Sequence, residues 1–382
     1  MFLPVLRRDA VPSRPGFVSA VVGPMLVVAL VTAIAALVYQ SSTMTEIVLL
    51  FGINAIMVVG FQLFAGNTGL VSFGHISFMA IGAYATAIVS MDPFDKSIVL
   101  KNLPRFLFNL HLSVIPSLLV GGVAAAVFGL ATGVVLMRLS GAAASIATLG
   151  LLVITTNVLS QASEFTHGPE SLFGVPQDAS FGWVFGTLAV AVLISGLFKW
   201  SRAGLEARAN RDDVIAGESV GIGSLRARLM PFTLSAFLTG VAGGLYAMLL
   251  TAFSPASFAI PLVVVVLTMA IVGGINSITG AVIGAALVTV LNELMRRVEN
   301  GATVLGVHLS APTGISAAVL GVALILTLRW RPEGLMSSYE LQFDRRKAAT
   351  EEPAAEDAPV GPASAAKPET LSKGDTHATQ RI

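Results

Sequence analysis

The stretch from Asn67 to Ala85 concentrates polar groups in a chain that is otherwise strongly apolar. Glycines at 66, 69, 74 and 82 lie among its polar side chains, which are Asn67, Thr68, Ser72, His75 and Ser77. These amide, hydroxyl and imidazole groups are neutral donors and acceptors, so they can pass a polar solute along without trapping it as a fixed charge would. Within a bilayer, polar groups must find partners or line water. The stretch therefore predicts part of the wall of a path through a membrane, with glycines that permit a broken or re-entrant helix.

A second interpretation of the same residues is structural. Ser72, Gly74 and Ser77 would then hold neighbouring helices together, because small residues allow helices in a membrane to approach closely. His75 would be a hydrogen-bonded group of the interior rather than a contact for a solute. The sequence leaves both interpretations open.

Asn157, preceded by two threonines, is predicted to face the same path from another segment. No phosphate-binding loop, H-E-x-x-H, G-x-S-x-G or paired-carboxylate motif occurs in the chain. The absence of cysteine excludes disulfides, thiolate metal sites and a cysteine nucleophile. We therefore predict no catalytic residue, no metal site and no bound cofactor, and we do not expect an enzyme. A net charge of +1 gives no ground for nucleic-acid binding.

The composition indicates how these residues are positioned. Only 12% of the 382 residues are charged, against about 25% in soluble domains, and the mean hydropathy is +0.81. A membrane span needs about 20 mostly apolar residues. Eight to ten spans fit the chain, which predicts an all-α polytopic membrane protein. The candidates are 17–38, 45–65, 69–90, 112–137, 142–160, 182–198, 231–252, 260–274, 278–295 and 310–328.

Basic residues predict the orientation, because cytoplasmic loops carry an excess of Lys and Arg. Ten spans with both termini in the cytoplasm of a bacterial inner membrane place more basic residues inside than outside. The inner set is Arg7, Arg8, Arg14, Arg138, Lys199, Arg202, Arg208, Arg211, Arg226, Arg228, Arg329 and Arg331, and the outer set is Lys96, Lys101, Arg105, Arg296 and Arg297. We expect residues 1–16 to form a cytoplasmic segment, residues 17–336 the membrane domain, and residues 337–382, which are poor in large apolar side chains, a disordered cytoplasmic tail.

The spans carry almost no charge at depth, since Glu46 and Glu293 lie near span ends. Ion-coupled carriers usually keep ionisable residues within their spans, so the energy for any active transport is expected from another chain. Spans two to five correspond in order to spans seven to ten, which are five spans further along the chain. Because five is an odd number, related halves would have opposite orientations in the membrane and form an inverted repeat. A passive channel or an ion-coupled carrier stays open at this point.

The longest internal polar segment on the predicted cytoplasmic side is SRAGLEARANRDDVIAGESVGIGSLRAR, residues 201–228. A short helix between Gly204 and Gly221 could dock into a groove on a cytoplasmic partner. The alternative is a solvated basic loop that obeys the positive-inside rule.

The segment resembles the coupling loop of branched-chain amino acid ABC transporter permeases. The matching residues are Gly204, Arg208, Ala209, Arg211, Asp212, Asp213, Ala216, Glu218, Gly221 and Ile222. Four further stretches are similar to this family: GNTGLVSFGHISFMAIGAY, the run 231–258 ending in Pro-x-x-Phe, a Gly-Gly-x-x-Ser-x-x-Gly pattern at 273–280, and RWRPEGL at 329–335. The resemblance covers about 50 to 336. We interpret Gly273, Gly274 and Gly280 as packing residues.

The resemblance implies a permease subunit of an ATP-driven importer for branched-chain or related amino acids. It implies a second related permease, as a heterodimer or a homodimer, two cytoplasmic ATPases that use the ATP, and an external solute-binding protein. Gly204 and Gly221 would end the coupling helix, while Arg208 and Arg211 would meet acidic or carbonyl groups on the ATPase. Ala143 and Ala144 stand where the family usually has Tyr-Phe, which leaves urea, short amides or another small solute as alternative substrates.

Overall fold

The computed structural model describes residues 17–38, 42–100, 103–299, 303–304, 307–308, 312, 314–331 and 333–336. The predictions for residues 1–16 and 337–382 lie outside these ranges.

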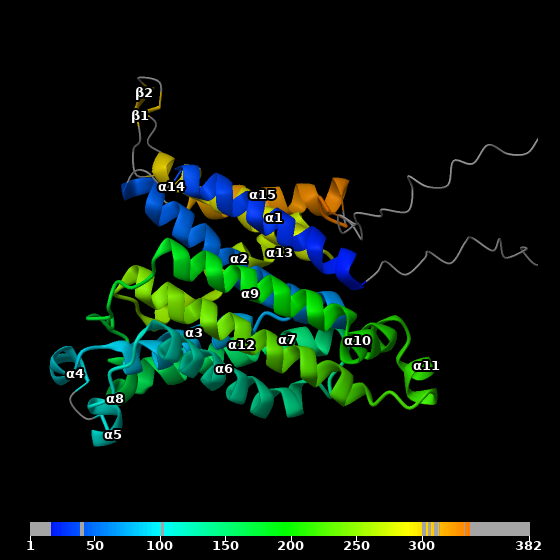
Figure 1. Cartoon of the computed structure of the whole chain (residues 1–382), viewed down its shortest axis with the longest axis horizontal. Coiled ribbons are helices and arrows are strands. Elements are labelled where there is room, and N and C mark those ends of the chain that lie inside the picture. The colour runs from blue at the N-terminus through cyan, green and yellow to red at the C-terminus, as the bar shows by residue number, and fades with distance from the viewer. Residues whose placement is uncertain are drawn as a thin grey trace, which may run out of the picture. The chain divides into compact units, whose positions relative to one another are not determined.

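Ten helices in the described part of the chain correspond to the ten predicted spans (Figure 1). Seven helical segments among the described residues are long and apolar enough to cross a membrane, and three shorter apolar helices accompany them. The prediction of an all-α polytopic membrane protein is confirmed. The ten helices are α1 (Phe17–Val38), α2 (Ser42–Thr68), α3 (His75–Ser90), α6 (Val114–Leu136), α7 (Gly141–Gln161), α9 (Phe181–Trp200), α12 (Ser224–Leu250), α13 (Ile260–Gly273), α14 (Ile278–Glu299) and α15 (Ile315–Trp330).

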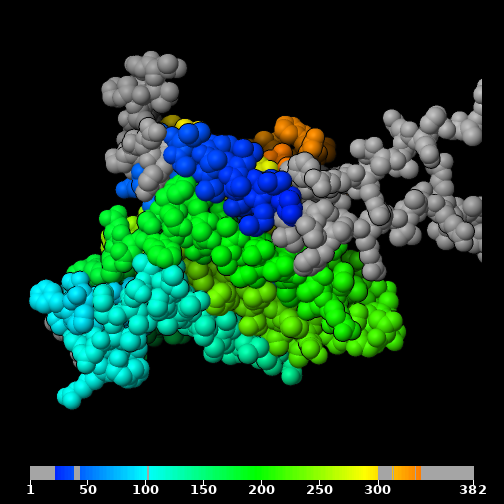
Figure 2. Space-filling view, viewed as in Figure 1, coloured from blue at the N-terminus to red at the C-terminus, as the bar shows by residue number. Residues whose placement is uncertain are grey.

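Short elements connect these helices at the two ends of the bundle (Figure 1). Helices α4 (Pro93–Val99), α5 (Arg105–Phe108) and α8 (Ser163–Thr166) lie at one end, and α10 (Arg202–Asp212) and α11 (Val214–Ser219) lie at the other. The α4–α5 segment protrudes in Figure 2, and the buried Lys96 holds it together by donating to the carbonyls of Leu107 and Leu110. The turn η1 (Pro255–Phe258) precedes α13, and β1 (Thr303–Val304) pairs antiparallel with β2 (Val307–His308).

Helices α2 and α12 form the centre of the bundle. Helix α12 packs on α6, α3 and α2, while α2 also contacts α9 and α14. Helices α13, α14 and α15 pack on one another, α13 and α14 both contact α2, and α1 lies against α9. Large apolar side chains on the outward faces are exposed, as on a surface that meets lipid; they include Val127 on α6, Ile146 on α7 and Ile325 on α15.

Glycines allow the closest helix crossings. A Cβ on Gly82 of α3 would collide with the backbone of Gly240 on α12, and a Cβ on Gly243 would collide with the carbonyl oxygen of Met79. Gly273 and Gly280 pack against each other's backbone where α13 meets α14, which confirms their interpretation as packing residues.

The prediction that a single span covers 69–90 is wrong at its start, because α3 begins only at His75. Gly69 has a φ of 70°, which ends α2 in a left-handed conformation open to glycine. Residues 69–74 connect α2 to α3 as irregular backbone that is only partly buried.

Candidate functional site

The break between α2 and α3 satisfies part of its backbone with its own short side chains. Thr68 Oγ1 donates to the carbonyl of Phe64 at 2.9 Å and accepts from the amide of Leu70 at 3.3 Å. Ser72 Oγ accepts from the amide of Gly74 at 3.3 Å, just before α3 begins. Both Thr68 and Ser72 are buried. Irregular backbone in a membrane protein needs polar partners because its groups are not paired within a helix. These contacts provide some of those partners.

Helix α7 supplies the other partners of this break. Ser145 Oγ donates to the carbonyl of Val71 at 2.6 Å, and Thr148 Oγ1 accepts from the amide of Phe73 at 3.1 Å. The Thr148 hydroxyl donates in turn to the carbonyl of Ser145 at 2.7 Å. The run Ser145–Gly150 therefore binds the polar stretch directly, although about 70 residues separate them.

His75 lies at the start of α3 inside an aromatic cage. Its exposed fraction is 1%, and its Nε2 lies 2.7 Å from Ser235 Oγ of α12. Four phenyl rings surround the imidazole with centroid distances of 5.3 to 5.7 Å; they belong to Phe61, Phe64, Phe78 and Phe232. The cage suits a neutral imidazole, because a charge would lose its hydration among these rings.

Four buried polar atoms in the stretch from Asn67 to Ala85 have no hydrogen-bond partner. They are Asn67 Oδ1, His75 Nδ1, Ser77 Oγ and Tyr84 Oη. The amide nitrogen of Asn67 is satisfied, because it donates to the carbonyl of Leu63 at 2.7 Å. A buried unpartnered polar group costs about 1–3 kcal/mol, so the three such atoms between Asn67 and Ser77 make this segment a candidate for binding a passing polar group or water.

Asn157 lies apart from this cluster. Its side chain is exposed on α7, and Nδ2 donates to the carbonyl of Val153 at 2.7 Å. It lines a surface hollow of about 500 Å³ together with Val153, Ile154, Val158, Gln161 and Ala162. The structure thus brings Asn67, Thr68, Ser72, His75 and Ser77 into one region and does not bring Asn157 to it.

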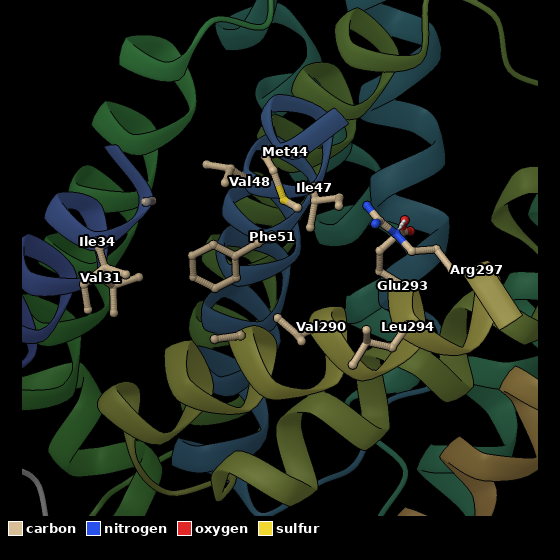
Figure 3. A pocket seen from close by; sticks show the side chains of 12 residues that line it. Val31, Ile34, Met44, Ile47, Val48, Phe51, Val290, Glu293, Leu294 and Arg297 are labelled. Carbon is tan, nitrogen blue, oxygen red and sulfur yellow. Dashed lines mark hydrogen bonds and ion pairs between the residues drawn. The ribbon is translucent and has the colours of Figure 1, made fainter. Parts of the chain in front are cut away.

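A second hollow has a different character. About 410 Å³ in volume, it lies between α1, α2 and α14, and its walls are aliphatic and aromatic, with Ile34, Phe51 and Val290 among them (Figure 3). Glu293 at its rim accepts from Nε of Arg296 at 2.8 Å and from Nε of Arg297 at 3.0 Å. Such walls match hydrocarbon chains and offer little to a polar solute.

The predicted coupling helix consists of two helices, α10 and α11, because Asp213 interrupts it. The backbone of Asp213 is extended, and its Oδ1 accepts from the amides of Ile215 at 2.9 Å and Ala216 at 3.0 Å. This arrangement is an N-cap, which begins a new helix. Gly221 follows α11 with a φ of 87° and ends it, as predicted.

Gly204 does not end a helix and lies in the first turn of α10. Ser201 caps this turn by accepting from the amide of Gly204 at 3.2 Å. A Cβ at position 204 would collide with the carbonyl oxygen of Phe198, so the glycine allows α10 to pack directly on the end of α9.

Two of the three arginines of α10, Arg208 and Arg211, bind this chain itself. Arg208 Nη2 donates to the carbonyl of Lys199 at 2.8 Å, and its guanidinium lies 5.3 Å from the ring centroid of Trp200. Arg211 Nη1 donates to the carbonyl of Gly66 at 2.7 Å and to Asn276 Oδ1 at 3.1 Å. Both guanidinium groups thus hold α10 against the bundle.

The outer face of α11 is open to solvent. Ile215 is 79% exposed and Val220 is 77% exposed, and Asp212, Asp213, Ala216 and Glu218 are exposed beside them. Ile215 on α11 and Val220 directly after it, among acidic residues, form an exposed surface able to dock into a groove.

Sequence reasoning did not identify four polar partners in these sites: Ser145, Thr148, Ser235 and Asn276. Ser145 and Thr148 belong to a stretch already noticed for its neighbouring alanines, so their hydroxyls were a usable signal. Ser235 and Asn276 carried none, since one lies in an apolar span and the other in a short turn.

A bundle of apolar helices, with an irregular segment between α2 and α3, is the architecture of a polytopic membrane protein. The family model described as "Branched-chain amino acid transport system / permease component" matches residues 43–328, and the chain belongs to this family. It is similar to the high-affinity branched-chain amino acid transport system permease protein LivM of Escherichia coli (strain K12), with 27% identity covering 85% of this chain and 77% of the relative. The LivM protein of Salmonella typhimurium (strain LT2) is also 27% identical, covering 77% and 69%. No solved structure matches the chain.

Proposed function

We propose that this chain is a permease subunit of an ATP-driven importer in a bacterial inner membrane, and that branched-chain or related amino acids are its substrates. It works with a second related permease, two cytoplasmic ATPases and an external solute-binding protein. ATP is used by the ATPases, and this chain binds no cofactor. The relatives named as branched-chain amino acid permeases support the substrate class.

The break between α2 and α3 carries this proposal. The unpartnered polar atoms of Asn67, His75 and Ser77 lie on α2 and α3, on either side of the break, and its groups are neutral. A neutral lining lets a zwitterion move on, whereas a fixed charge would hold one of its ends. In the described conformation these groups are enclosed, so passage requires α2, α3 and α12 to separate around His75.

The α10–α11 unit supports the second part of the proposal. It lies at the end of the bundle where α1 begins and α15 ends (Figure 1), which agrees with cytoplasmic termini. Its exposed apolar side chains offer the ATPase a docking surface. Acidic residues lie beside these side chains, which distinguishes this surface from the lipid-facing surface of the bundle.

Reconstitution into vesicles tests the function. The full complex, assembled from this chain and the proposed ATPases, second permease and binding protein, should accumulate radiolabelled leucine, isoleucine or valine when ATP is present on the ATPase side. An uncoupler should have no effect, and ATPases lacking their phosphate-loop lysine should abolish uptake. Uptake of urea or acetamide in place of amino acids would correct the substrate. Accumulation by this chain alone, driven by an ion gradient, would overturn the proposal.

A further inference from the structure

We propose that Arg211 is the positioning residue that transmits movement of the α10–α11 unit to the α2–α3 break and to the turn between α13 and α14. The inference rests on the proposed function, because it names the link between ATPase docking and the path. It differs from the expectation that Arg211 contacts the ATPase.

The first contact of Arg211 is with the end of α2. Gly66 lies in the last turn of this helix, where carbonyl groups have no partner within the helix. Arg211 Nη1 donates to the Gly66 carbonyl at 2.7 Å, and a cation at a helix C-terminus is also favoured by the helix dipole. Gly66 precedes Asn67, the first residue of the polar stretch, so the guanidinium holds the end of α2 directly before the break.

The stem of Arg211 makes the second contact. A Cβ on Gly69 would lie 2.7 Å from Cγ of Arg211 and 3.0 Å from its Cδ. Position 69 therefore requires glycine for two reasons: its φ of 70° and the side chain that passes over it. Arg211 thus lies across the residue at which α2 ends.

The third contact is with the turn between α13 and α14. Arg211 Nη1 donates to Asn276 Oδ1 at 3.1 Å, and Lys199 Nζ donates to the backbone carbonyl of Asn276 at 2.8 Å. The turn lies directly against α2, because a Cβ on Gly66 would lie 2.7 Å from the carbonyl oxygen of Ile275. One guanidinium therefore joins three elements that are far apart in the sequence.

The exposed helix α11 is fixed to α10, so a force on it reaches Arg211. Asp213 links the two helices through its cap, and a Cβ added to Gly217 would lie 3.6 Å from Cα of Asn210. Arg211 is also oriented by Asp212, whose Oδ1 accepts from Nε at 3.2 Å. A partner that moves α11 must then move the end of α2 and the α13–α14 turn, or break these bonds.

The test compares Arg211→Gln with Arg202→Gln, a matched change at an exposed arginine of the same helix. In the reconstituted complex, we measure ATPase co-purification, ATP hydrolysis and solute transported per ATP. Arg211→Gln should keep the ATPase bound and hydrolysing, while transport per ATP falls at least tenfold. Arg211→Lys should recover part of the ratio, because one ammonium can still reach Gly66 or Asn276. Arg202→Gln should match the wild type.

Asn276→Ala provides the second arm. Combined with Arg211→Gln, it should add little further loss, since both changes break the same contact. An unchanged transport ratio in Arg211→Gln overturns the inference, and so does loss of the ATPase, which would assign Arg211 to docking. If Arg211→Gln fails to fold, transport per ATP by Arg211→Lys is the deciding measurement. A value below that of the wild type supports the inference, and a wild-type value overturns it. A wild-type complex that hydrolyses ATP without accumulating solute contradicts the proposed function instead.

Discussion

At the scale of single residues, His75 combines a satisfied nitrogen and an unsatisfied one in the same cage. Nε2 is paired with Ser235, which suits a structural role, whereas the buried Nδ1 has no partner. A purely structural histidine could be replaced by a ring of similar size. A histidine that contacts the solute through Nδ1 could not.

His75→Phe separates these roles. A phenyl ring fits among the four surrounding rings, and the hydroxyl of Ser235 can bond to a carbonyl of its own helix. We expect the melting temperature in detergent to change by only a few degrees, while ATP-driven uptake falls at least tenfold. Wild-type uptake by His75→Phe would assign the residue to packing alone.

Ser235→Ala is the complementary change at the same contact. It leaves His75 Nε2 buried without its partner, which should cost about 1–3 kcal/mol of stability. Denaturant or thermal unfolding monitored by circular dichroism measures this loss. If stability does not change, the 2.7 Å contact contributes nothing measurable.

At the scale of elements, the sequence predicted which segments are helices better than where they interact. Among the described residues, hydropathy located the seven long apolar helices and the three shorter ones, because each contains a run of apolar residues. It placed the start of α3 too early, since Gly69 takes a left-handed φ and the irregular residues that follow are held by Ser145 and Thr148 of α7. Those partners are distant in sequence, so periodicity could not identify them.

The coupling segment shows the same limit. Glycines 204 and 221 suggested one helix, but the aspartate at 213 caps a second one. The partners of Arg211 lie 145 and 65 residues away, at Gly66 and Asn276. From the sequence alone, a basic residue in a polar loop is expected to be solvated. Only the packing of the helices brings Arg211 into contact with Gly66 and Asn276.

Helix α11 leads to a prediction about docking. Ile215→Asp places a charge where an apolar side chain is 79% exposed. The fold should tolerate the change, because the side chain has little to lose, but ATPase co-purification should fall at least tenfold. Ile98→Asp on α4, at the opposite end of the bundle, is the matched control and should keep the ATPase. Equal retention by both variants would place the docking surface elsewhere.

The crossing of α3 and α12 leads to a prediction about packing. Gly243→Ala adds a methyl group that collides with the backbone of Met79, which the helices can relieve only by moving apart. Overpacking of this kind costs about 1–3 kcal/mol. Gly186→Ala on α9 has no atom within 4 Å of the new methyl group and should be neutral. Thermal melting of the two purified variants provides the comparison, and an equal melting temperature would contradict the close crossing.

At the scale of the whole molecule, residues 333–336 pack against the group formed by α13, α14 and α15. The amide of Leu335 donates to the carbonyl of Val272 at 2.9 Å, and the amide of Met336 donates to the carbonyl of Gly273 at 3.1 Å. These bonds satisfy carbonyls at the C-terminus of α13. Residues 333–336 thereby cover the turn whose Asn276 binds Arg211, so the last described residues support the same junction as the coupling unit.

Truncation tests this support. A chain that ends at Met336 keeps every contact just described and should assemble and transport like the full chain. A chain that ends at Arg331 exposes the two carbonyls of α13 and should melt at least several degrees lower, with reduced transport per ATP because the turn is no longer held. Gly334→Ala gives a point variant of the same effect, since its φ of 80° costs about 1–2 kcal/mol for a residue with a side chain. Identical melting and transport for the two truncated chains would show that the junction holds without residues 333–336.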